Sequence, residues 1–183
     1  AKKHRMIDGL IVSFTTYKER TKYLPTVYKS ILGQTYVPEK TILWVSKEEY
    51  DPDNLPYVFK WCIRNGLEIR FVDDDLKSHK KYLYAMQEYP DKTIITIDDD
   101  VVYDNKMIEK LWEAHEAYPE VVIGSRVHKM AVSEDGIDKY DEWTLNDYTL
   151  YYKPSNLGMA TGVGGILYPA GCLPDIAFDK ETT

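Results

Sequence analysis

Stretches typical of buried β-strands alternate with stretches typical of amphipathic helices over residues 9–127. The strand-like stretches are rich in apolar and β-branched residues, whereas the helix-like stretches repeat apolar residues every three or four positions. This alternation predicts an α/β fold in which a mainly parallel sheet is flanked by helices. The predicted strands are residues 9–16, 40–46, 67–73, 92–98 and 120–127, and the predicted helices are residues 21–34, 55–66, 78–90 and 105–119.

The alternation stops after Val127. We expect a hairpin around residues 134–136, then a polar and aromatic loop, and then the glycine-rich strand "TGVGGILYP" at residues 161–169. No repeat and no linker divides the chain, so we expect one domain over residues 1–183 with a C-terminal hairpin and loop region. The abrupt end of the sequence leaves open whether the domain is truncated there.

Charge and composition exclude several classes of protein. The formal net charge is −7, which argues against nucleic acid as a partner, since nucleic-acid binding favours a basic surface. No apolar run approaches the roughly 18 residues of a transmembrane segment. The two cysteines, Cys62 and Cys172, are too few for a disulfide framework, so we expect a reducing, cytoplasmic location.

Polar side chains follow three of the predicted parallel strands. Ligands of open α/β sheets bind beyond the carboxyl ends of such strands, so we expect these side chains to meet at one edge. The clusters are residues 13–20, 73–75 and 98–100.

The cluster Asp98-Asp99-Asp100 ends the apolar stretch "IITI". Adjacent carboxylates repel, by about 1 kcal/mol per pair in water and by more where the dielectric is lower. A divalent cation would offset this repulsion, and Mg²⁺ or Mn²⁺ binds one or two carboxylates together with diphosphate oxygens and water. The alternative is that the triplet only begins a turn before the next helix. The apolar residues Val101 and Val102 favour the metal site, because they hold the turn against protein.

The other charged clusters each have two interpretations. Residues 73–75 either begin a helix, whose N-terminus favours acidic groups, or bind a base or ribose hydroxyl. The basic residues 77–81 are either a solvated helix start or a phosphate site, because anions favour that position. Arg20 is either a surface charge or a second phosphate ligand.

Four segments taken together resemble GT-A glycosyltransferases, which use nucleotide-diphosphate sugars. The segments are "SFTTYKER", "SILGQTYVPEKTILWVS", the acidic strand end before "HKKYLYAM", and "IITIDDDVVY". The similarity extends over about residues 8–170, and it is greatest to bacterial enzymes of polysaccharide or surface-glycan assembly. The segment "GVGGILYP" also resembles the loop that closes the donor and acceptor site of that group.

The resemblance implies roles for individual residues. Asp98 and Asp100 would bind Mn²⁺ or Mg²⁺, with Asp98 also near the ribose and Asp99 sharing either role. The other residues would bind the nucleotide sugar, for which a UDP-sugar is expected. They are Ser13, Thr15, Thr16, Arg20, Asp73, Lys80, Lys81, Gly162, Gly164 and Gly165.

The resemblance implies transfer to a glycan or a lipid-linked acceptor, with peripheral membrane association as one option. An inverting transferase would also need a carboxylate base, for which Asp175 is the candidate within this chain. Two alternatives remain. A nucleotidyltransferase would want a glycine-rich loop after the first strand, which "SFTTYKER" lacks. A non-catalytic module would bind nucleotide sugar or glycan without transfer.

Overall fold

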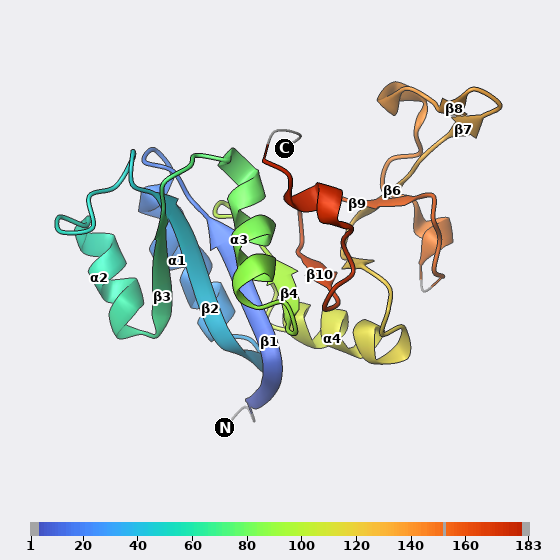
Figure 1. Cartoon of the computed structure of the whole chain (residues 1–183). Helices are drawn as coiled ribbons and strands as arrows, with labels where there is room; N and C mark the ends of the chain where they lie inside the picture. The colour runs from blue at the N-terminus through green and yellow to red at the C-terminus, as the bar shows by residue number, and fades with distance from the viewer. Residues whose placement is uncertain (1–3, 152, 181–183) are drawn as a thin grey trace.

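The computed structural model of the chain describes residues 4–151 and 153–180 (Figure 1). Its centre is a six-stranded sheet with the order β3-β2-β1-β4-β10-β5. The strands, in chain order, are β1 (Arg5–Thr15), β2 (Tyr36–Ser46), β3 (Leu67–Val72), β4 (Thr93–Thr96), β5 (Ile123–Gly124) and β10 (Ile166–Tyr168).

The first four strands of this sheet are parallel. β1 pairs in parallel with β2 and β4, and β2 pairs in parallel with β3. β10 is antiparallel to both of its neighbours, β4 and β5. The predicted α/β fold with a mainly parallel sheet is therefore confirmed. The prediction of one strand over residues 120–127 is wrong, because β10 occupies the place beside β4 and only the short β5 joins the sheet.

Helices cover both faces of the sheet, which explains why the three isoleucines of "IITI" are all buried. Ile95 and Ile97 face a core cluster that includes residues of α1 (Leu24–Leu32), α2 (Tyr57–Arg64) and α4 (Met107–Ala117). Ile94 points to the opposite face, where its cluster includes Ala85 of α3 (Lys80–Glu88). Figure 1 shows α3 on one side of the sheet and α1 on the other. β4 thus has the double burial expected of a central strand.

One irregularity bends the long strand β1. The register between β1 and β2 shifts between Ile7 and Ile11, and Gly9 lies there with φ of +78°. Glycine tolerates this left-handed conformation without steric cost. The Gly9 N–H donates to Glu39 Oε2 at 2.8 Å, which satisfies a backbone group that the irregular pairing would otherwise leave free.

The later part of the chain forms two small sheets beside the main one. β6 (Val127–Lys129) pairs with β9 (Gly158–Ala160), and β7 (Val132–Ser133) pairs with β8 (Gly136–Ile137) around the predicted hairpin. No helix within the described residues has the length and apolar character needed to cross a bilayer. Short 3₁₀ helices complete the described chain. They are η1 (Thr21–Tyr23), η2 (Lys77–His79), η3 (Tyr140–Glu142), η4 (Tyr148–Leu150) and η5 (Asp175–Phe178).

Candidate active site

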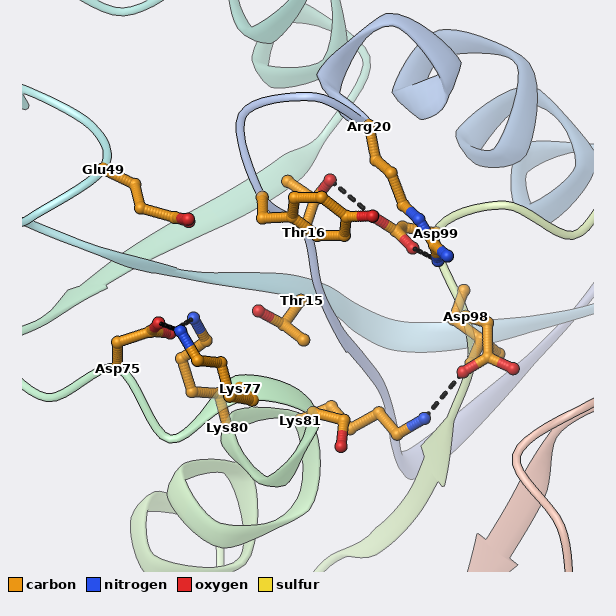
Figure 2. Close-up of a pocket in the computed structure, with 13 residues that line it drawn as sticks. Thr15, Thr16, Arg20, Glu49, Asp75, Lys77, Lys80, Lys81, Asp98 and Asp99 are labelled. Atoms are coloured by element: carbon orange, nitrogen blue, oxygen red, sulfur yellow. Dashed lines mark hydrogen bonds and ion pairs between the residues drawn. The ribbon is translucent and has the colours of Figure 1, made fainter.

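A pocket of about 420 Å³ lies where the four parallel strands end (Figure 2). Loops that follow β1, β2, β3 and β4 all contribute to its wall, as the parallel pairing requires. The volume is in the range of small-molecule sites. Its lining residues are Thr15, Thr16, Tyr17, Arg20, Glu49, Asp75, Lys77, Ser78, Lys80, Lys81, Ile97, Asp98 and Asp99.

Arg20 holds two of the three aspartates that follow β4. Its Nη1 lies 3.0 Å from Asp99 Oδ1 and 2.9 Å from Asp100 Oδ2. The buried Asp99 also accepts a hydrogen bond from Thr16 Oγ1 at 2.7 Å. The hydrogen bond to Asp99 raises the pKa of Arg20, so this cation stays charged. Asp99 is therefore a structural link between the loops after β1 and β4.

Asp98 has a different partner on the opposite side of the pocket. Lys81 Nζ, from α3, donates to Asp98 Oδ1 at 2.7 Å, and the two side chains point toward each other in Figure 2. The backbone N–H of Asp98 donates to the buried Tyr103 hydroxyl at 2.8 Å. A Cβ built on Gly162 would lie 3.2 Å from both Asp98 oxygens and 3.3 Å from Lys81 Nζ. Gly162 thus lies against this ion pair, where a side chain would crowd it.

These contacts change the interpretation of the acidic triplet. The sequence suggests a divalent cation as the compensating charge, whereas in the structure Arg20 and Lys81 already neutralise part of it. No group of three or more His, Cys, Asp or Glu side chains in the described ranges is arranged to hold a metal. Magnesium and manganese need only one or two carboxylates when a diphosphate supplies further oxygens. The donor set therefore fits a cation that binds together with a nucleotide.

Asp98 and Asp100 are the aspartates able to contribute to such a site. Each uses one carboxylate oxygen, Asp98 Oδ1 with Lys81 and Asp100 Oδ2 with Arg20. Their second oxygens make no hydrogen bond or ion pair to the residues described. Asp100 is the more accessible of the two, with 41% of its side chain exposed against 23% for Asp98. Asp100 does not line the pocket itself but lies next to it in the chain.

The far end of the pocket contains a second charged group. Lys80 is 2% exposed, and its Nζ donates to Asp75 Oδ1 at 2.5 Å, while Lys77 donates to Asp75 Oδ2. Burial alone would raise the pKa of Asp75, but the hydrogen bonds from Lys77 and Lys80 outweigh it and lower the value to about 2. Asp75 is therefore fully ionised and already bonded through both oxygens.

The structure distributes the predicted nucleotide-binding residues unequally. Thr15 and Thr16 line the pocket, although Thr15 Oγ1 donates to the Trp44 carbonyl at 2.8 Å. Ser13 is buried below it and donates to the Lys81 carbonyl at 2.5 Å, so it supports α3. Asp73 does not line the pocket, because its side chain is 83% exposed and pairs with Lys47. The residue of that acidic cluster that reaches the pocket is Asp75.

Glu49 is a pocket residue that sequence reasoning missed. It follows β2 in the loop 47–50, at the same edge of the sheet as the other clusters. Its Oε2 is buried with no hydrogen-bond partner among the described residues, and burial raises the pKa of the carboxyl group. The only signal in the sequence was its place after a predicted parallel strand, which many exposed glutamates share.

The glycine-rich segment separates this pocket from a larger cavity of about 850 Å³. Gly162 faces Asp98 and Lys81, whereas Val163 and Gly164 line the larger cavity. Gly164 and Gly165 have φ of +90° and +94°, which favours glycine at both positions. Gly165 is packed against Met107 and Leu111, away from the pocket at the strand ends.

Asp175, the predicted base, is exposed in η5 and lines neither cavity. The segment that carries it lies beside α3 (Figure 1), where the Tyr82 hydroxyl donates to the Ala177 carbonyl at 3.4 Å. Lys180 pairs with Asp74 in the loop after β3. These contacts attach the C-terminal segment to α3 and to the loop after β3.

A mainly parallel sheet with a charged pocket at its carboxyl edge defines the class of α/β proteins that bind a ligand at the strand ends. The chain belongs to the glycosyl transferase family 64 domain family, whose model matches residues 10–153. This match confirms the predicted class, glycosyltransferase. No curated protein sequence matches the chain.

The solved structures that are similar to this chain are distant in sequence. CMP:2-keto-3-deoxy-manno-octonic acid synthetase complexed with CTP is similar with a TM-score of 0.52 and 13% identity, over 92% of this chain and 75% of that one. A Pyrobaculum calidifontis mannosyltransferase in complex with GDP-Man and Mn²⁺ has a TM-score of 0.47 and 13% identity, over 63% of this chain. S. aureus TarS 1-349 has the same TM-score and identity, over 72%. This chain spans only 34% and 43% of the last two structures.

Proposed function

We propose that this domain transfers a sugar from a nucleotide-diphosphate donor to a hydroxyl group of an acceptor, with Mn²⁺ or Mg²⁺ as the metal. The observation that carries the proposal is the arrangement of the triplet 98–100, which lies at one end of the pocket between Arg20 and Lys81. Carboxylates and cations lie side by side there, so carboxylates are available for a metal and cations for a diphosphate.

Asp98 and Asp100 are the residues that would hold the metal, through the oxygens that Lys81 and Arg20 leave free. A divalent ion at this position would offset the negative charge that develops on the departing diphosphate. Asp99 would not be a ligand, because both of its oxygens are engaged by Thr16 and Arg20.

Arg20 and Lys81 would bind the diphosphate itself. Both side chains line the pocket, and each already lies within 3.0 Å of an aspartate of the triplet. A guanidinium group suits bidentate binding of phosphate oxygens, and an ammonium group supplies a compact charge. Lys80 has a different role, because its burial and its bond to Asp75 fix it within the wall of the pocket.

The larger cavity beyond Gly162 is the proposed acceptor side. Gly162, in the loop 161–165 beside this cavity, lies against the Asp98–Lys81 pair, and the wall of the cavity includes Tyr148, whose side chain is exposed. Tyrosine rings stack well on sugar rings because they combine an apolar face with a polar tip. We propose a glycan or a lipid-linked molecule as the acceptor. The lipid-linked option rests on the resemblance to enzymes of surface-glycan assembly.

The test compares Asp100→Asn with the wild-type domain. Calorimetry would measure the binding of nucleoside diphosphates with and without Mn²⁺. We expect the variant to melt like the wild type, because Asp100 is exposed, and to lose most of the Mn²⁺-dependent gain in affinity. Binding that depends on Mn²⁺ to the same extent in both proteins would contradict the metal assignment. Glu48→Gln, an exposed charge change outside the pocket, is the matched control.

Product analysis separates transfer from its two alternatives. Release of nucleoside diphosphate from a nucleotide sugar supports a glycosyltransferase. Release of pyrophosphate from a nucleoside triphosphate and a sugar phosphate would instead indicate a nucleotidyltransferase. Binding of nucleotide sugar without either product, even with candidate acceptors present, would indicate a non-catalytic module.

A further inference from the structure

Glu49 is a half-buried residue with one buried oxygen, Oε2, for which the described residues supply no donor. Its Oε2 has no hydrogen-bond partner among the described residues, although the side chain lines the nucleotide pocket. An unsatisfied buried polar atom is costly, and most such atoms in proteins have a partner. The missing partner is therefore expected to come from a ligand that enters the pocket.

Neighbouring charges make Glu49 the available acceptor at this end of the pocket. Asp75 lies opposite it in Figure 2, but Lys77 and Lys80 already occupy both of its oxygens. Neither lysine pairs directly with Glu49. The carboxylate of Glu49 is thus free to accept hydrogen bonds from a bound molecule.

The position of Glu49 indicates which part of a nucleotide it would meet. Figure 2 shows Glu49 and Asp75 at one end of the pocket and Asp98, Asp99 and Arg20 at the other. A nucleoside diphosphate whose phosphates lie near the triplet would extend its base toward Glu49. This placement rests on the proposed function, which puts the metal at Asp98 and Asp100 and the diphosphate at Arg20 and Lys81.

We propose that Glu49 reads the nucleobase and selects guanine, so that the donor is a GDP-sugar rather than the UDP-sugar that the resemblance implied. The edge of guanine presents two adjacent donors, the N1–H and the exocyclic amine, which match the two oxygens of a carboxylate. Uracil presents one N–H between two carbonyl oxygens, and a carboxylate repels those oxygens. Lys77, at the same end, carries an ammonium group that can donate to guanine O6.

The experiment measures the binding of GDP, UDP and xanthosine diphosphate, each with Mn²⁺, to the wild type and to Glu49→Gln. Wild type should bind GDP at least about 10-fold more tightly than UDP, as expected for a hydrogen bond to a charged group. Xanthine replaces the exocyclic amine of guanine by a carbonyl. The side-chain amide that the substitution introduces would donate to that carbonyl, so the variant should lose affinity for GDP and gain affinity for xanthosine diphosphate.

Three results would overturn the proposal in distinguishable ways. Tighter binding of UDP than of GDP by the wild type would reject guanine selection but leave the proposed function intact. An equal loss of affinity for all three nucleotides in Glu49→Gln would place Glu49 at the ribose instead of the base. Failure of every nucleotide to bind would reject the proposed function itself. Glu49→Gln should melt at or above the wild-type temperature, because it removes the charge of a half-buried carboxyl group whose Oε2 is buried without a partner. Glu48→Gln is again the control.

Discussion

Lys81 Nζ on α3 lies 2.7 Å from Asp98 Oδ1 at the end of β4, so one ion pair joins the two sides of the nucleotide pocket. Both side chains are largely buried, with 15% and 23% of their surfaces exposed. The pair fixes the position of the first aspartate of the triplet before any ligand arrives. Residues that touch this pair should therefore affect nucleotide binding more than they affect folding.

Gly162→Ala should weaken the binding of nucleoside diphosphate with Mn²⁺ by about 10-fold. The new methyl group would lie 3.2 Å from the Asp98 oxygens and would push the ion pair out of its present geometry. Because Gly162 does not have a positive φ, alanine adds little backbone strain. Calorimetry and a thermal melt would measure the two effects, with Gly33→Ala as control. A Cβ built on Gly33 would lie 3.4 Å from the Lys29 carbonyl oxygen, and Gly33 does not line the pocket. Equal affinity in Gly162→Ala and the wild type would contradict this prediction.

Tyr103→Phe should lower both stability and nucleotide affinity. It removes the hydroxyl that accepts the Asp98 backbone N–H, and an unsatisfied buried donor costs about 1–3 kcal/mol. Tyr28→Phe is a matched control, because the Tyr28 hydroxyl is also in the core and donates to the Asn65 carbonyl, outside the pocket. Urea unfolding should show comparable losses in both variants. Only Tyr103→Phe should show weaker nucleotide binding, and a similar loss of binding in Tyr28→Phe would contradict a local effect.

Asp75→Asn should destabilise the domain by about 3 kcal/mol, because it leaves the buried Lys80 ammonium without its partner. Adding Lys80→Met should recover much of this loss, since the second change removes the unpaired charge. Lys77→Ala should cost less than about 1 kcal/mol, because Lys77 is 81% exposed. Denaturant midpoints of the four proteins would measure these values. A double variant as unstable as Asp75→Asn alone would show that the pair is not the cause.

The stabilising effect of Asp75 should disappear in acid. The folded pKa of about 2 lies below the ordinary value of 3.8, so the group stabilises the fold fully above about pH 4. That contribution, about 2 kcal/mol, should be lost as pH falls from about 4 to 2. The measurement is the difference in unfolding free energy between the wild type and Asp75→Asn across this range. A difference that stays constant down to pH 2 would contradict the low pKa.

The repeating pattern of the first hundred residues predicted the parallel strands and the edge where the site forms. Burial of "IITI" on both faces could be predicted because a central strand covered on both faces is nearly continuous in apolar residues. The place of β10 could not, since its three residues, Ile166–Tyr168, carry no signal for an antiparallel strand beside β4.

Side-chain direction was the less predictable part of the site. Asp73 and Asp75 are two positions apart after β3, and only the structure shows that the chain turns Asp75 toward Lys80 and leaves Asp73 in solvent. The compensation of the triplet by Arg20 and Lys81 is also non-local, because these residues are 79 and 17 positions away from their aspartates. Spacing in the sequence does not report such pairs.

The residues that line the pocket at the strand ends and the residues of the glycine loop beside it come from different parts of the chain. Every residue that lines this pocket precedes residue 100. The glycine loop 161–165 lies directly before β10, the strand that pairs with β4. Residues 125–165 could therefore be exchanged for those of another transferase, and the part that recognises the nucleotide would keep its own loops. Such chimaeras would test the proposal that residues 125–165 determine acceptor choice while the first hundred residues supply the donor site.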